Sequence, residues 1–441
     1  MPVAVEPISD DFVLPWEADV VVIGGGIVGV STAYFLAESG QRVVLCEKGI
    51  IAGEQSSRNW GWCRSMGRDP REIPLMVESL SIWRTLNQRL NDETGFRQTG
   101  TLYICPDEQA YAKREAWLPH ARENGIASVM LRGSKVNEVL TGAAENWAGA
   151  LYTPSDGVAE PSHATPAIAR AARRLGATIL QRCAVRGLDM QAGRVAGVVT
   201  ERGRIRASRV VLAGGAWSSL FVSASGVRFP QLKVVATVLR TAWTDQGPGT
   251  AAWGPGLALR KRLDGGYTVS NGMVAADIVP DSFRFFADFI PLLKQEWLGM
   301  STRLNSAFLD EWRLTRKWAL DETSPFEKVR TLDPEPSEKE VKAARRNLEQ
   351  SFPAFRSVPT IASWAGMIDA TPDLVPAISE IDSVPGLILS SGYSGHGFGI
   401  GPGAGKLTAQ IASGQAPFVD PAPFGFSRFL DGRKLRPETG F

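Results

Sequence analysis

Three glycines at a fixed spacing are the residues of this chain whose chemistry is easiest to specify. Gly24, Gly26 and Gly29 form the pattern G-x-G-x-x-G directly after a run of four apolar residues. The first glycine permits a tight turn, the second lets a diphosphate approach the main chain, and the third lets a helix pack close to a strand. Free N–H groups at the N-terminus of that helix favour negative charge. The spacing predicts a dinucleotide-binding site, which also includes Ile27 and Val28.

A carboxylate follows at the distance that such a site requires. The apolar run 43–46 ends on Glu47, 18 positions after Gly29. At the end of a second strand, a carboxylate can bind both hydroxyl groups of a ribose. We therefore predict that Glu47 and its neighbour Lys48 bind the nucleotide.

The elements that must position these residues recur in blocks along the chain. Strand patterns followed by glycines occur near residues 20, 210 and 388, whereas residues 232–279 contain strand patterns without long helices. This order predicts the α/β fold class (α+β overall), with a Rossmann-like nucleotide-binding domain built from the discontinuous segments 15–90, 151–230 and 356–441. Segments 91–150 and 231–355 are expected to form a β-rich substrate domain with covering helices. The active site is then predicted at the cleft between the two domains.

Shorter patterns predict individual elements. Residues 96–104 indicate a strand, residues 108–124 a charged helix, and residues 406–412 a helix near the C-terminus. Residues 281–300 have an amphipathic pattern. We interpret this stretch as a helix that covers the substrate domain, and contact with a membrane surface is the alternative.

Composition excludes several classes of protein. The 441 residues are 44% hydrophobic and 21% charged, with a net charge of +2, which suits a globular protein and disfavours nucleic acid as a partner. No apolar run reaches the roughly 18 residues of a membrane span, and residues 1–19 lack a signal-peptide pattern. The four cysteines form no C-x-x-C pattern, and only three histidines occur. We expect no metal site and a cytoplasmic location.

Four blocks of sequence share an order and spacing that covers nearly the whole chain. The first is the glycine pattern with Glu47-Lys48, and the second is 53–61 (GEQSSRNWG). The third is 213–217 (AGGAW), and the fourth is 364–376 (WAGMIDATPDLVP), continued by 392–399 (GYSGHGFG). Together they resemble the D-amino-acid-oxidase-type family of FAD-dependent oxidoreductases, which includes glycine oxidase, sarcosine oxidase and D-amino-acid dehydrogenases. Segment 58–65 is also similar to the β subunit of heterotetrameric sarcosine oxidases.

The resemblance implies a bound FAD. This cofactor is longer than NAD, and separate glycine-rich loops would supply the main-chain approaches that it needs along its length. No cysteine lies within 231–441 and no histidine follows Ser56-Ser57, so we expect FAD to be bound non-covalently. Besides the residues of the first block, the predicted cofactor-binding residues are Ser56, Ser57, Arg58, Asn59, Trp60, Val185, Gly214, Trp217, Gly366, Gly395, His396, Gly397, Phe398 and Gly399.

The resemblance also implies the reaction, which is oxidation of the C–N bond of an amino acid or of a secondary or cyclic amine. A hydride leaves the α-carbon for flavin N5, and the resulting imine hydrolyses. An FAD-linked 2-hydroxy-acid dehydrogenase and a non-catalytic flavoprotein partner subunit are the alternatives. Oxygen, a quinone or another carrier would take the electrons. In sarcosine-oxidase-like enzymes, a lysine near the flavin helps oxygen react. Segment 267–279 contains no lysine, although Lys261 precedes it, and this absence favours a dehydrogenase or a slow oxidase.

Substrate binding is predicted to depend on an arginine. A guanidinium binds a carboxylate through two parallel hydrogen bonds, and sarcosine-oxidase-like sequences have an arginine at the position that matches Arg64. Arg68 and Arg316 are weaker candidates. The resemblance is incomplete at Gly399, where sarcosine oxidases have a lysine, so one carboxylate contact is missing and sarcosine itself is a doubtful substrate.

Three further residues complete the predicted site. Trp62, together with Trp60, is expected to wall a pocket for a bulky or cyclic amine. His396 is predicted to be catalytic, either by moving a proton or by donating a hydrogen bond to the flavin.

Overall fold

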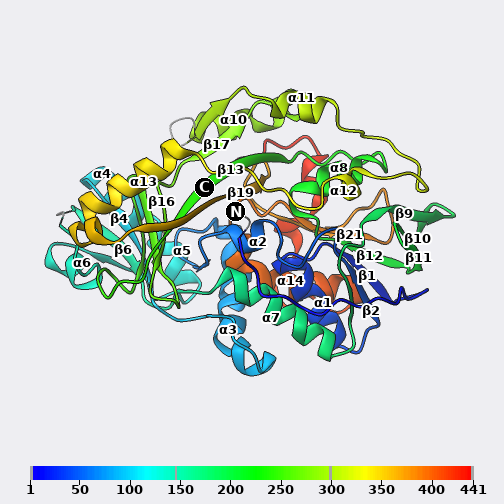
Figure 1. Ribbon diagram of the computed structural model, residues 1–441, viewed down its shortest axis with the longest axis horizontal. Helices are drawn as coiled ribbons and strands as arrows, with labels where there is room; N and C mark the ends of the chain where they lie inside the picture. Colours follow the sequence, from blue (N-terminus) through cyan, green and yellow to red (C-terminus); the bar gives the residue numbers. More distant parts are fainter. Residues whose placement is uncertain (1–2, 145–146, 297–299, 439–441) are drawn as a thin grey trace.

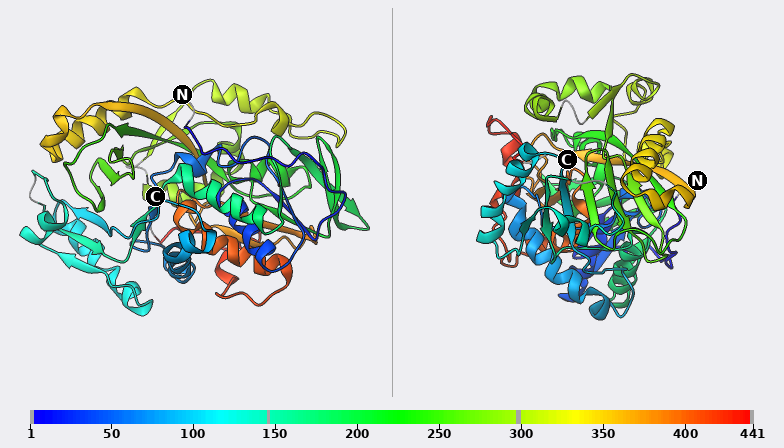
Figure 2. Two further views of the ribbon diagram at one scale, coloured as in Figure 1. Left: turned by 60° about the horizontal axis from the view of Figure 1, so that its bottom comes forward. Right: turned by 90° about the vertical axis from the view of Figure 1, so that its left-hand side faces the viewer.

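The two main sheets lie toward opposite ends of the molecule in the computed structural model, which describes residues 3–144, 147–296 and 300–438 (Figure 1). Blue segments from the start of the chain and orange segments from its end meet in one part, and cyan, green and yellow segments form the other. Figure 2 shows the same two parts from two further directions. This arrangement agrees with the predicted mixed α/β class.

The described residues form a six-stranded sheet in the first part, with parallel pairing except between its first two strands. All four residues of its central strand β1 are buried because side chains pack against both faces of the sheet. Burial on both faces explains the uninterrupted apolar run that precedes the glycines. In spatial order the strands are β20 (Ala377–Glu380), β21 (Leu387–Ser391), β12 (Arg209–Leu212), β1 (Val20–Ile23), β2 (Val43–Cys46) and β8 (Thr178–Leu180).

Four long helices gather below this sheet in the view of Figure 1. The first of them, α1, is buried along almost its whole length because it packs against two of the others, α7 and α14. Its N-terminus follows directly after the glycine turn, as the sequence predicts. The four helices are α1 (Ile27–Glu38), α3 (Ile73–Leu90), α7 (Pro161–Arg174) and α14 (Gly397–Ser413).

The extent of α14 differs from the prediction, since the helix begins at Gly397 and not near residue 406. Glycine is a poor helix former, so the five glycines between 397 and 405 predicted a loop. Close packing explains the helix: a Cβ atom on Gly399 would lie 2.7 Å from the Trp62 carbonyl oxygen, and one on Gly405 would lie 2.4 Å from Ser31 Cβ. The glycines therefore let α14 approach α1 and the short strand β3 (Trp62–Cys63).

A larger, mostly antiparallel sheet forms the second part of the described chain. Its strands in order are β18 (Met300–Arg303), β17 (Val274–Asp277), β13 (Leu232–Thr241), β16 (Tyr267–Ser270), β15 (Leu257–Lys261), β14 (Ala251–Gly254), β4 (Thr101–Cys105), β6 (Gly149–Thr153) and β5 (Val129–Leu131), and β19 (Thr360–Ala370) also pairs with β13. The predicted strand 96–104 corresponds to β4. The predicted domain boundaries stay a prediction. Strand β19 lies within segment 356–441, which was assigned to the nucleotide-binding domain, but it pairs along its length with β13 of the large sheet.

Shorter elements complete both parts. The predicted helix 108–124 is interrupted, and it forms α4 and α5. The remaining elements are α2 (Gln55–Arg58), α4 (Glu108–Glu115), α5 (Leu118–Glu123), α6 (Ser134–Val139), β7 (Gly157–Val158), β9 (Val185–Gln191), β10 (Arg194–Thr200), β11 (Gly203–Arg206), α8 (Ser218–Ser223), α12 (Pro325–Lys328), α13 (Glu338–Ser351) and five short 3-10 turns, among them η1 (Pro70–Glu72).

The amphipathic stretch 281–300 forms two helices and not one. They are α9 (Pro280–Arg284) and α10 (Phe286–Glu296), and the final residue of the stretch begins β18; residues 297–299 lie outside the described part. Phe285, Phe289 and Leu292 are buried against neighbouring apolar residues that include Ala370 and Leu374, as expected of covering helices. Among the described helices, none is both long and apolar enough to cross a membrane.

Candidate active site

Three neighbouring cavities follow one another through the molecule. Their empty volumes, including space open to solvent, are about 890, 590 and 860 Å³. The first, which we call the glycine cavity, is lined by residues 24–26 and 213–217; the middle cavity is lined by Ile27, Val28 and Tyr393; the third, the tryptophan cavity, is lined by Trp60, Trp62 and Trp253. Adjacent cavities share lining residues: Gly26, Ser56 and Asp369 join the first two, and Asn59, Gly395 and Phe398 join the last two.

The floor of the glycine cavity is made of main chain. A Cβ atom on Gly24 would lie 2.3 Å from the Ala213 carbonyl oxygen, and one on Gly29 would lie 2.0 Å from the Gly24 carbonyl oxygen. A Cβ atom on Gly26 would lie 3.0 Å from Ser56 Oγ. A long ligand with a diphosphate can therefore approach the N-terminus of α1, where no side chain stands in its way. These residues fit the predicted dinucleotide.

Glu47 closes the glycine cavity at the end of β2. Its two carboxylate oxygens accept hydrogen bonds from the main-chain N–H groups of Gly25 (2.7 Å) and Gly49 (2.6 Å). Burial raises the pKa of this carboxyl group. The carboxylate thus holds the glycine turn and lies where a ribose hydroxyl is expected.

Lys48 connects the walls of the same cavity. Its Nζ lies 2.6 Å from Glu54 Oε1 and donates to the carbonyl oxygens of Val329 and Arg330, both at 3.0 Å. It also lies 4.6 Å from the centroid of the Trp217 ring. These contacts make Lys48 part of the wall, so its predicted contact with the cofactor remains a prediction.

The structure brings most of the predicted cofactor-binding residues to the cavity walls. Three predicted residues, Gly29, Ser57 and Gly366, lie behind the walls. Gly29 packs against Gly24, Ser57 Oγ donates a hydrogen bond to the Glu54 carbonyl oxygen (3.1 Å), and Gly366 packs against Gln55. Those that line one or more cavities are Gly24, Gly26, Ile27, Val28, Glu47, Lys48, Ser56, Arg58, Asn59, Trp60, Val185, Gly214, Trp217, Gly395, His396, Gly397, Phe398 and Gly399.

Arg58 and Asn59 hold the loop that leads from α2 into the tryptophan cavity. Arg58 Nη1 pairs with Asp333 Oδ1 (2.5 Å) and donates to the Ala365 carbonyl oxygen (3.0 Å). The Asn59 side chain donates to the Ser56 carbonyl oxygen (2.9 Å) and accepts from the Gly61 N–H group (2.7 Å). Both side chains therefore shape the loop in addition to lining the cavity.

Aromatic rings dominate one side of the tryptophan cavity. The ring centroids of Trp60 and Trp62 are 5.4 Å apart, and those of Trp60 and Trp253 are 5.8 Å apart, both in edge-to-face arrangements. Apolar side chains from the large sheet, including Val238 and Met273, extend this surface. Such a surface suits a large apolar or aromatic group.

Arg64 lies in the same cavity as a buried cation. Its side chain has no carboxylate partner within salt-bridge distance in the described part of the chain, and the residue is 7% exposed. Nη1 donates to the Met66 carbonyl oxygen (2.5 Å), and the guanidinium lies 5.4 Å from the centroid of the Tyr103 ring. A buried charge without a counter-ion is unfavourable, so this position suits an anionic group of a ligand.

The buried carboxylate of Asp156 fixes the main chain next to Arg64. It accepts hydrogen bonds from the N–H and hydroxyl groups of Ser65 (both 2.7 Å), from the Met66 N–H group (3.2 Å) and from Thr101 Oγ1 (2.6 Å). The carbonyl oxygen that Arg64 contacts is therefore held in place by a residue from a distant segment.

Arg68, Glu72 and His396 form a buried cluster beside Arg64. Arg68 pairs with Glu72 (3.4 Å) and donates to the His396 carbonyl oxygen (3.2 Å), and His396 Nδ1 lies 3.4 Å from Glu72 Oε2. Neither ring nitrogen of His396 makes a hydrogen bond to the described residues. Burial lowers the pKa of this histidine although Glu72 acts in the opposite direction, so we expect a neutral ring at pH 7.

Arg68 and Arg316, the weaker candidates for carboxylate binding, both have acidic partners. Arg68 is paired with Glu72, as described above, and Arg316 pairs with Asp281 (2.6 Å) and does not line the tryptophan cavity. Among these arginines, Arg64 is thus the one that a ligand carboxylate could neutralise.

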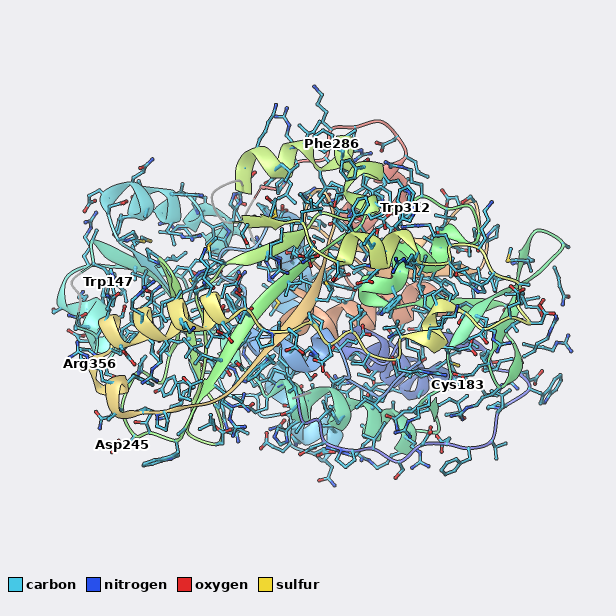
Figure 3. The ribbon with its side chains drawn as sticks, turned by 45° about the horizontal axis from the view of Figure 1, so that its top comes forward. Trp147, Cys183, Asp245, Phe286, Trp312 and Arg356 are labelled. Carbon is cyan, nitrogen blue, oxygen red and sulfur yellow. The ribbon has the colours of Figure 1, made fainter. Side chains whose placement is uncertain are left out.

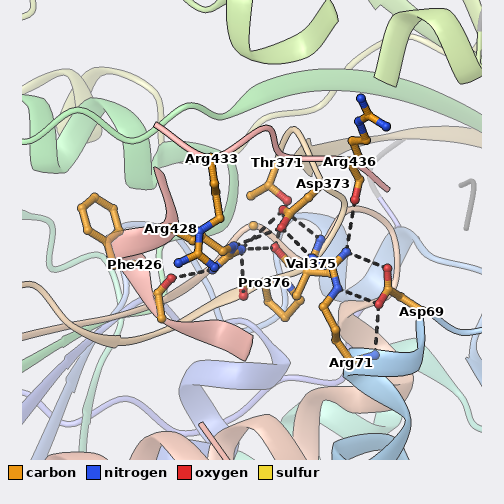
Figure 4. A network of polar contacts seen from close by, with 12 residues as sticks. Asp69, Arg71, Thr371, Asp373, Val375, Pro376, Phe426, Arg428, Arg433 and Arg436 are labelled. Carbon is orange, nitrogen blue, oxygen red and sulfur yellow. Dashed lines mark hydrogen bonds and ion pairs between the residues drawn. The ribbon is translucent and has the colours of Figure 1, made fainter. Parts of the chain in front are cut away.

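Ion pairs and hydrogen bonds join residues near the C-terminus to the turn at Asp69 and Arg71 (Figure 4). Arg71 lies between the buried Asp373 (3.3 Å) and Asp69 (2.8 Å). Arg428 contacts the same Asp373 at 3.1 Å. Through Asp373, Arg428 is therefore connected by ion pairs to Arg71, on the turn that directly follows Arg68.

Sequence reasoning missed several residues of the site. Trp253 and Met273 come from strands and turns of the large sheet, and no motif distinguishes them from packing residues. Asp369 lies within the fourth block, and its carboxylate, which accepts from the Gly392 N–H group (2.8 Å), lines two cavities. The order of that block was the available signal for it.

Comparisons with known proteins agree with this geometry. The family model "FAD dependent oxidoreductase" (DAO) matches residues 19–411. The chain is 34% identical to L-amino acid deaminase from Proteus myxofaciens, whose structure was solved with anthranilate; the match covers 97% of this chain and 96% of that one, with a TM-score of 0.94.

Two curated relatives are 26% identical to the chain. Sarcosine oxidase subunit beta from an Arthrobacter species matches over 95% of this chain and 92% of its own length, and glycine oxidase from Pseudomonas aeruginosa matches over 92% and 97%. The predicted family and the predicted cofactor are thereby confirmed. The chain is an enzyme that uses FAD, and it belongs to the DAO family of FAD-dependent oxidoreductases.

Proposed function

We propose that this enzyme oxidises the C–N bond of an α-amino acid that has a large apolar or aromatic side chain. The proposal rests on the buried guanidinium of Arg64, which forms no ion pair with a described carboxylate and lies in a cavity walled by three tryptophans. The guanidinium would bind the substrate carboxylate, and the indole rings would contact the side chain. The amino group would then lie between these two contacts.

The chain contributes binding and orientation, and FAD, when bound, accepts the hydride that leaves the substrate α-carbon. The glycine and middle cavities would hold FAD, with Glu47 at its ribose and residues 395–399 near its flavin end. His396, with Glu72 at 3.4 Å, is the proposed proton shuttle for the substrate amino group. The imine product hydrolyses in water to a keto acid and ammonia.

The relatives support a large substrate. The L-amino acid deaminase from Proteus myxofaciens binds anthranilate, which combines an aromatic ring with a carboxylate. Glycine and sarcosine, which are named for the other relatives, would leave the tryptophan surface without contacts. We therefore expect higher kcat/KM for aromatic and branched amino acids than for glycine or sarcosine.

Anaerobic reduction of the bound flavin tests this function directly. The purified holoenzyme would be mixed with D- and L-amino acids, N-methyl amino acids, cyclic imino acids and 2-hydroxy acids, and bleaching and ammonia release would be measured. Bleaching by large amino acids with one ammonia per turnover supports the proposal. Keto-acid formation from hydroxy acids without ammonia would instead support the 2-hydroxy-acid dehydrogenase.

The electron acceptor is proposed to be a quinone or another carrier and not oxygen. Among the described residues, no lysine lines the tryptophan cavity. Lys261 is not part of that lining, and its Nζ lies 5.9 Å from the centroid of the Tyr267 ring. In sarcosine-oxidase-like enzymes, which this chain resembles, a lysine near the flavin helps oxygen react. Turnover with a quinone analogue that is much faster than oxygen consumption would support this assignment.

An exposed apolar surface on the covering helices fits a membrane-bound acceptor. Phe283, Phe286 and Leu309 are more than half exposed, as is Trp312 at the end of α11 (Ala307–Trp312); Phe286 and Trp312 are labelled in Figure 3. We propose a peripheral lipid contact here. Sedimentation with phosphatidylglycerol vesicles should fall when Phe286 and Trp312 are replaced by serine, and unchanged sedimentation would contradict the contact.

A further inference from the structure

A buried ion pair lies directly behind the wall of the tryptophan cavity. Arg260 on β15 and Glu160, the residue before α7, have side chains that are 1% and 3% exposed. Their contact is bidentate, with Nη1–Oε1 at 2.7 Å and Nη2–Oε2 at 3.1 Å. The third donor of the same guanidinium, Nε, binds the carbonyl oxygen of Trp60. One side chain thus connects the large sheet, the start of α7 and the tryptophan loop.

The backbone next to Trp60 is confined on both sides. Gly61 has a φ angle of 79°, and a Cβ atom there would lie 2.4 Å from the Ala159 carbonyl oxygen and 2.7 Å from Arg260 Nε. The Gly61 carbonyl oxygen accepts a hydrogen bond from the Ala159 N–H group (2.8 Å). Movement of the Trp60–Gly61 main chain would therefore break the hydrogen bond to Arg260 or the one to Ala159, or would displace Arg260 from Glu160.

The chemistry of arginine explains why this residue type occupies the position. A planar guanidinium directs its donors along fixed directions, so a bidentate contact to Glu160 determines where Nε points. Lysine could keep the charge but not the three directed hydrogen bonds. A buried ion pair often contributes little net stability compared with apolar residues. We therefore expect the main effect of this pair to be on the geometry of the loop.

We propose that Arg260 and Glu160 are positioning residues that set the side-chain specificity of the enzyme. They fix the main chain of Trp60, and thereby the indole ring that contacts both Trp62 and Trp253. Neither residue lines the cavity, so the effect passes through Trp60. This inference rests on the proposed function of the same cavity.

The first test is the variant Arg260→Lys, compared with Arg240→Lys as a matched control. Arg240 forms a similar pair with Asp264 in the large sheet, but its side chain is 35% exposed. In Arg260→Lys we expect KM for a large apolar amino acid to rise about tenfold while kcat and the KM for alanine change little. Arg240→Lys should leave all of these values unchanged. Equal changes for large and small substrates would overturn the inference.

A binding measurement separates this inference from the proposed function. The Kd of anthranilate, measured by the change in flavin absorbance, requires no turnover and should rise about tenfold in Arg260→Lys. If no amino acid bleaches the wild-type flavin, the proposed function fails, but the anthranilate measurement still decides the role of the ion pair. An unchanged Kd would overturn that role.

A second variant addresses misfolding. Replacing both partners, Arg260→Met with Glu160→Met, removes the two charges together, and Arg262, which also contacts Glu160 (3.5 Å), keeps its ion pair with Asp264 (3.0 Å). If this variant folds with FAD bound, it should show the same loss of preference for large ligands as Arg260→Lys. A folded double variant with the wild-type preference would contradict the proposal.

Discussion

The glycine cavity and the tryptophan cavity, which we propose form one active site, are built in different ways. The glycine turn at residues 24–26 and Glu47, which are close together in the sequence, form the floor and one end of the first, and its walls include Trp217, Phe326 and Asp369 from distant segments. Aromatic side chains dominate the second, and Trp62, Trp253 and His396 come from three segments far apart in the chain. The turn that is proposed to bind the diphosphate is thus encoded locally, whereas the surface that is proposed to select a substrate depends on tertiary packing.

The two cavities should therefore fail in different ways when they are altered. A change in the glycine cavity is expected to remove the cofactor and destabilise the fold. A change in the tryptophan cavity is expected to keep a yellow, folded protein with altered kinetics.

The largest effect is expected for Gly29→Ala. The added methyl group would lie 2.0 Å from the Gly24 carbonyl oxygen, so α1 must move away from the strand. We expect loss of bound FAD and a loss of stability above about 3 kcal/mol, measured by flavin absorbance and thermal unfolding. Gly249→Ala, where no atom lies within 4 Å of the added Cβ, is the control. A yellow Gly29→Ala protein of normal stability would remove the contrast.

Arg64→Ala should keep FAD but weaken substrate binding. Loss of a buried ion pair with the substrate carboxylate is expected to cost about 2–4 kcal/mol in kcat/KM. An amine that lacks the carboxylate should be oxidised equally by both proteins. Arg316→Ala removes an arginine that pairs with Asp281 away from the cavity, and it should leave kcat/KM unchanged. An unchanged apparent affinity of Arg64→Ala for amino acids would exclude the assigned role.

The free energy of unfolding should decrease at acid pH because of Glu160, which lies behind the wall of the tryptophan cavity. Burial acts to raise the pKa of this carboxyl group, but Arg260 and Arg262 outweigh it and lower the pKa from 4.5 to about 2. Because the folded-state pKa is the lower one, the stabilisation is fully present above about pH 5 and is lost as pH falls toward 2. It corresponds to roughly 3 kcal/mol.

Urea unfolding between pH 7 and pH 3 measures this effect. Glu160→Gln should be less stable at pH 7, and the difference from wild type should shrink as the pH falls. A difference that stays constant with pH would contradict the assignment. Glu47 in the glycine cavity should behave oppositely: burial raises its pKa above the ordinary 4.5, so its contribution to stability is present below pH 4.5 and is lost as the pH rises through the raised pKa.

The smallest effect is expected for Trp253→Leu. This substitution enlarges the tryptophan cavity without touching Arg64 or the glycine turn. We expect the ratio of kcat/KM values for aromatic and branched aliphatic amino acids to change about tenfold, with FAD content unchanged. Steady-state kinetics with phenylalanine and leucine measure the ratio. A proportional loss for both substrates would show that Trp253 acts on the fold and not on selection.

Much of the fold could be predicted from local patterns. The buried strand before Gly24, the helix after it and the strand that ends at Glu47 all occur where the spacing placed them. The predictions were wrong in extent where packing outweighed propensity. The glycines of residues 397–405 are helical and let α14 approach α1 closely. Residues 281–300 form two helices that meet at Phe285, whose side chain is buried in one cluster with Ala370 and Leu374.

The candidate substrate site could be predicted only in part. Arg64 and Trp62 were found through a resemblance and line the cavity, although their roles remain proposals. Trp253, Arg260 and Glu160 could not be found from the sequence. A tryptophan in a strand has no local signature, and neither does an ion pair between residues 100 positions apart. Their proximity depends on how the large sheet packs against α7.

The sequence by itself determined the family and the cofactor, and it predicted the glycine turn at which the diphosphate is proposed to bind, because such a turn needs particular glycines at short spacing and these can be recognised in one segment. Only the tertiary structure decided which arginine is left without a counter-ion and which rings surround it. Those properties arise from pairing and burial among residues far apart in the chain. Arg64 and Arg316 have the same side chain, and they differ because Asp281 neutralises one of them and no described carboxylate reaches the other.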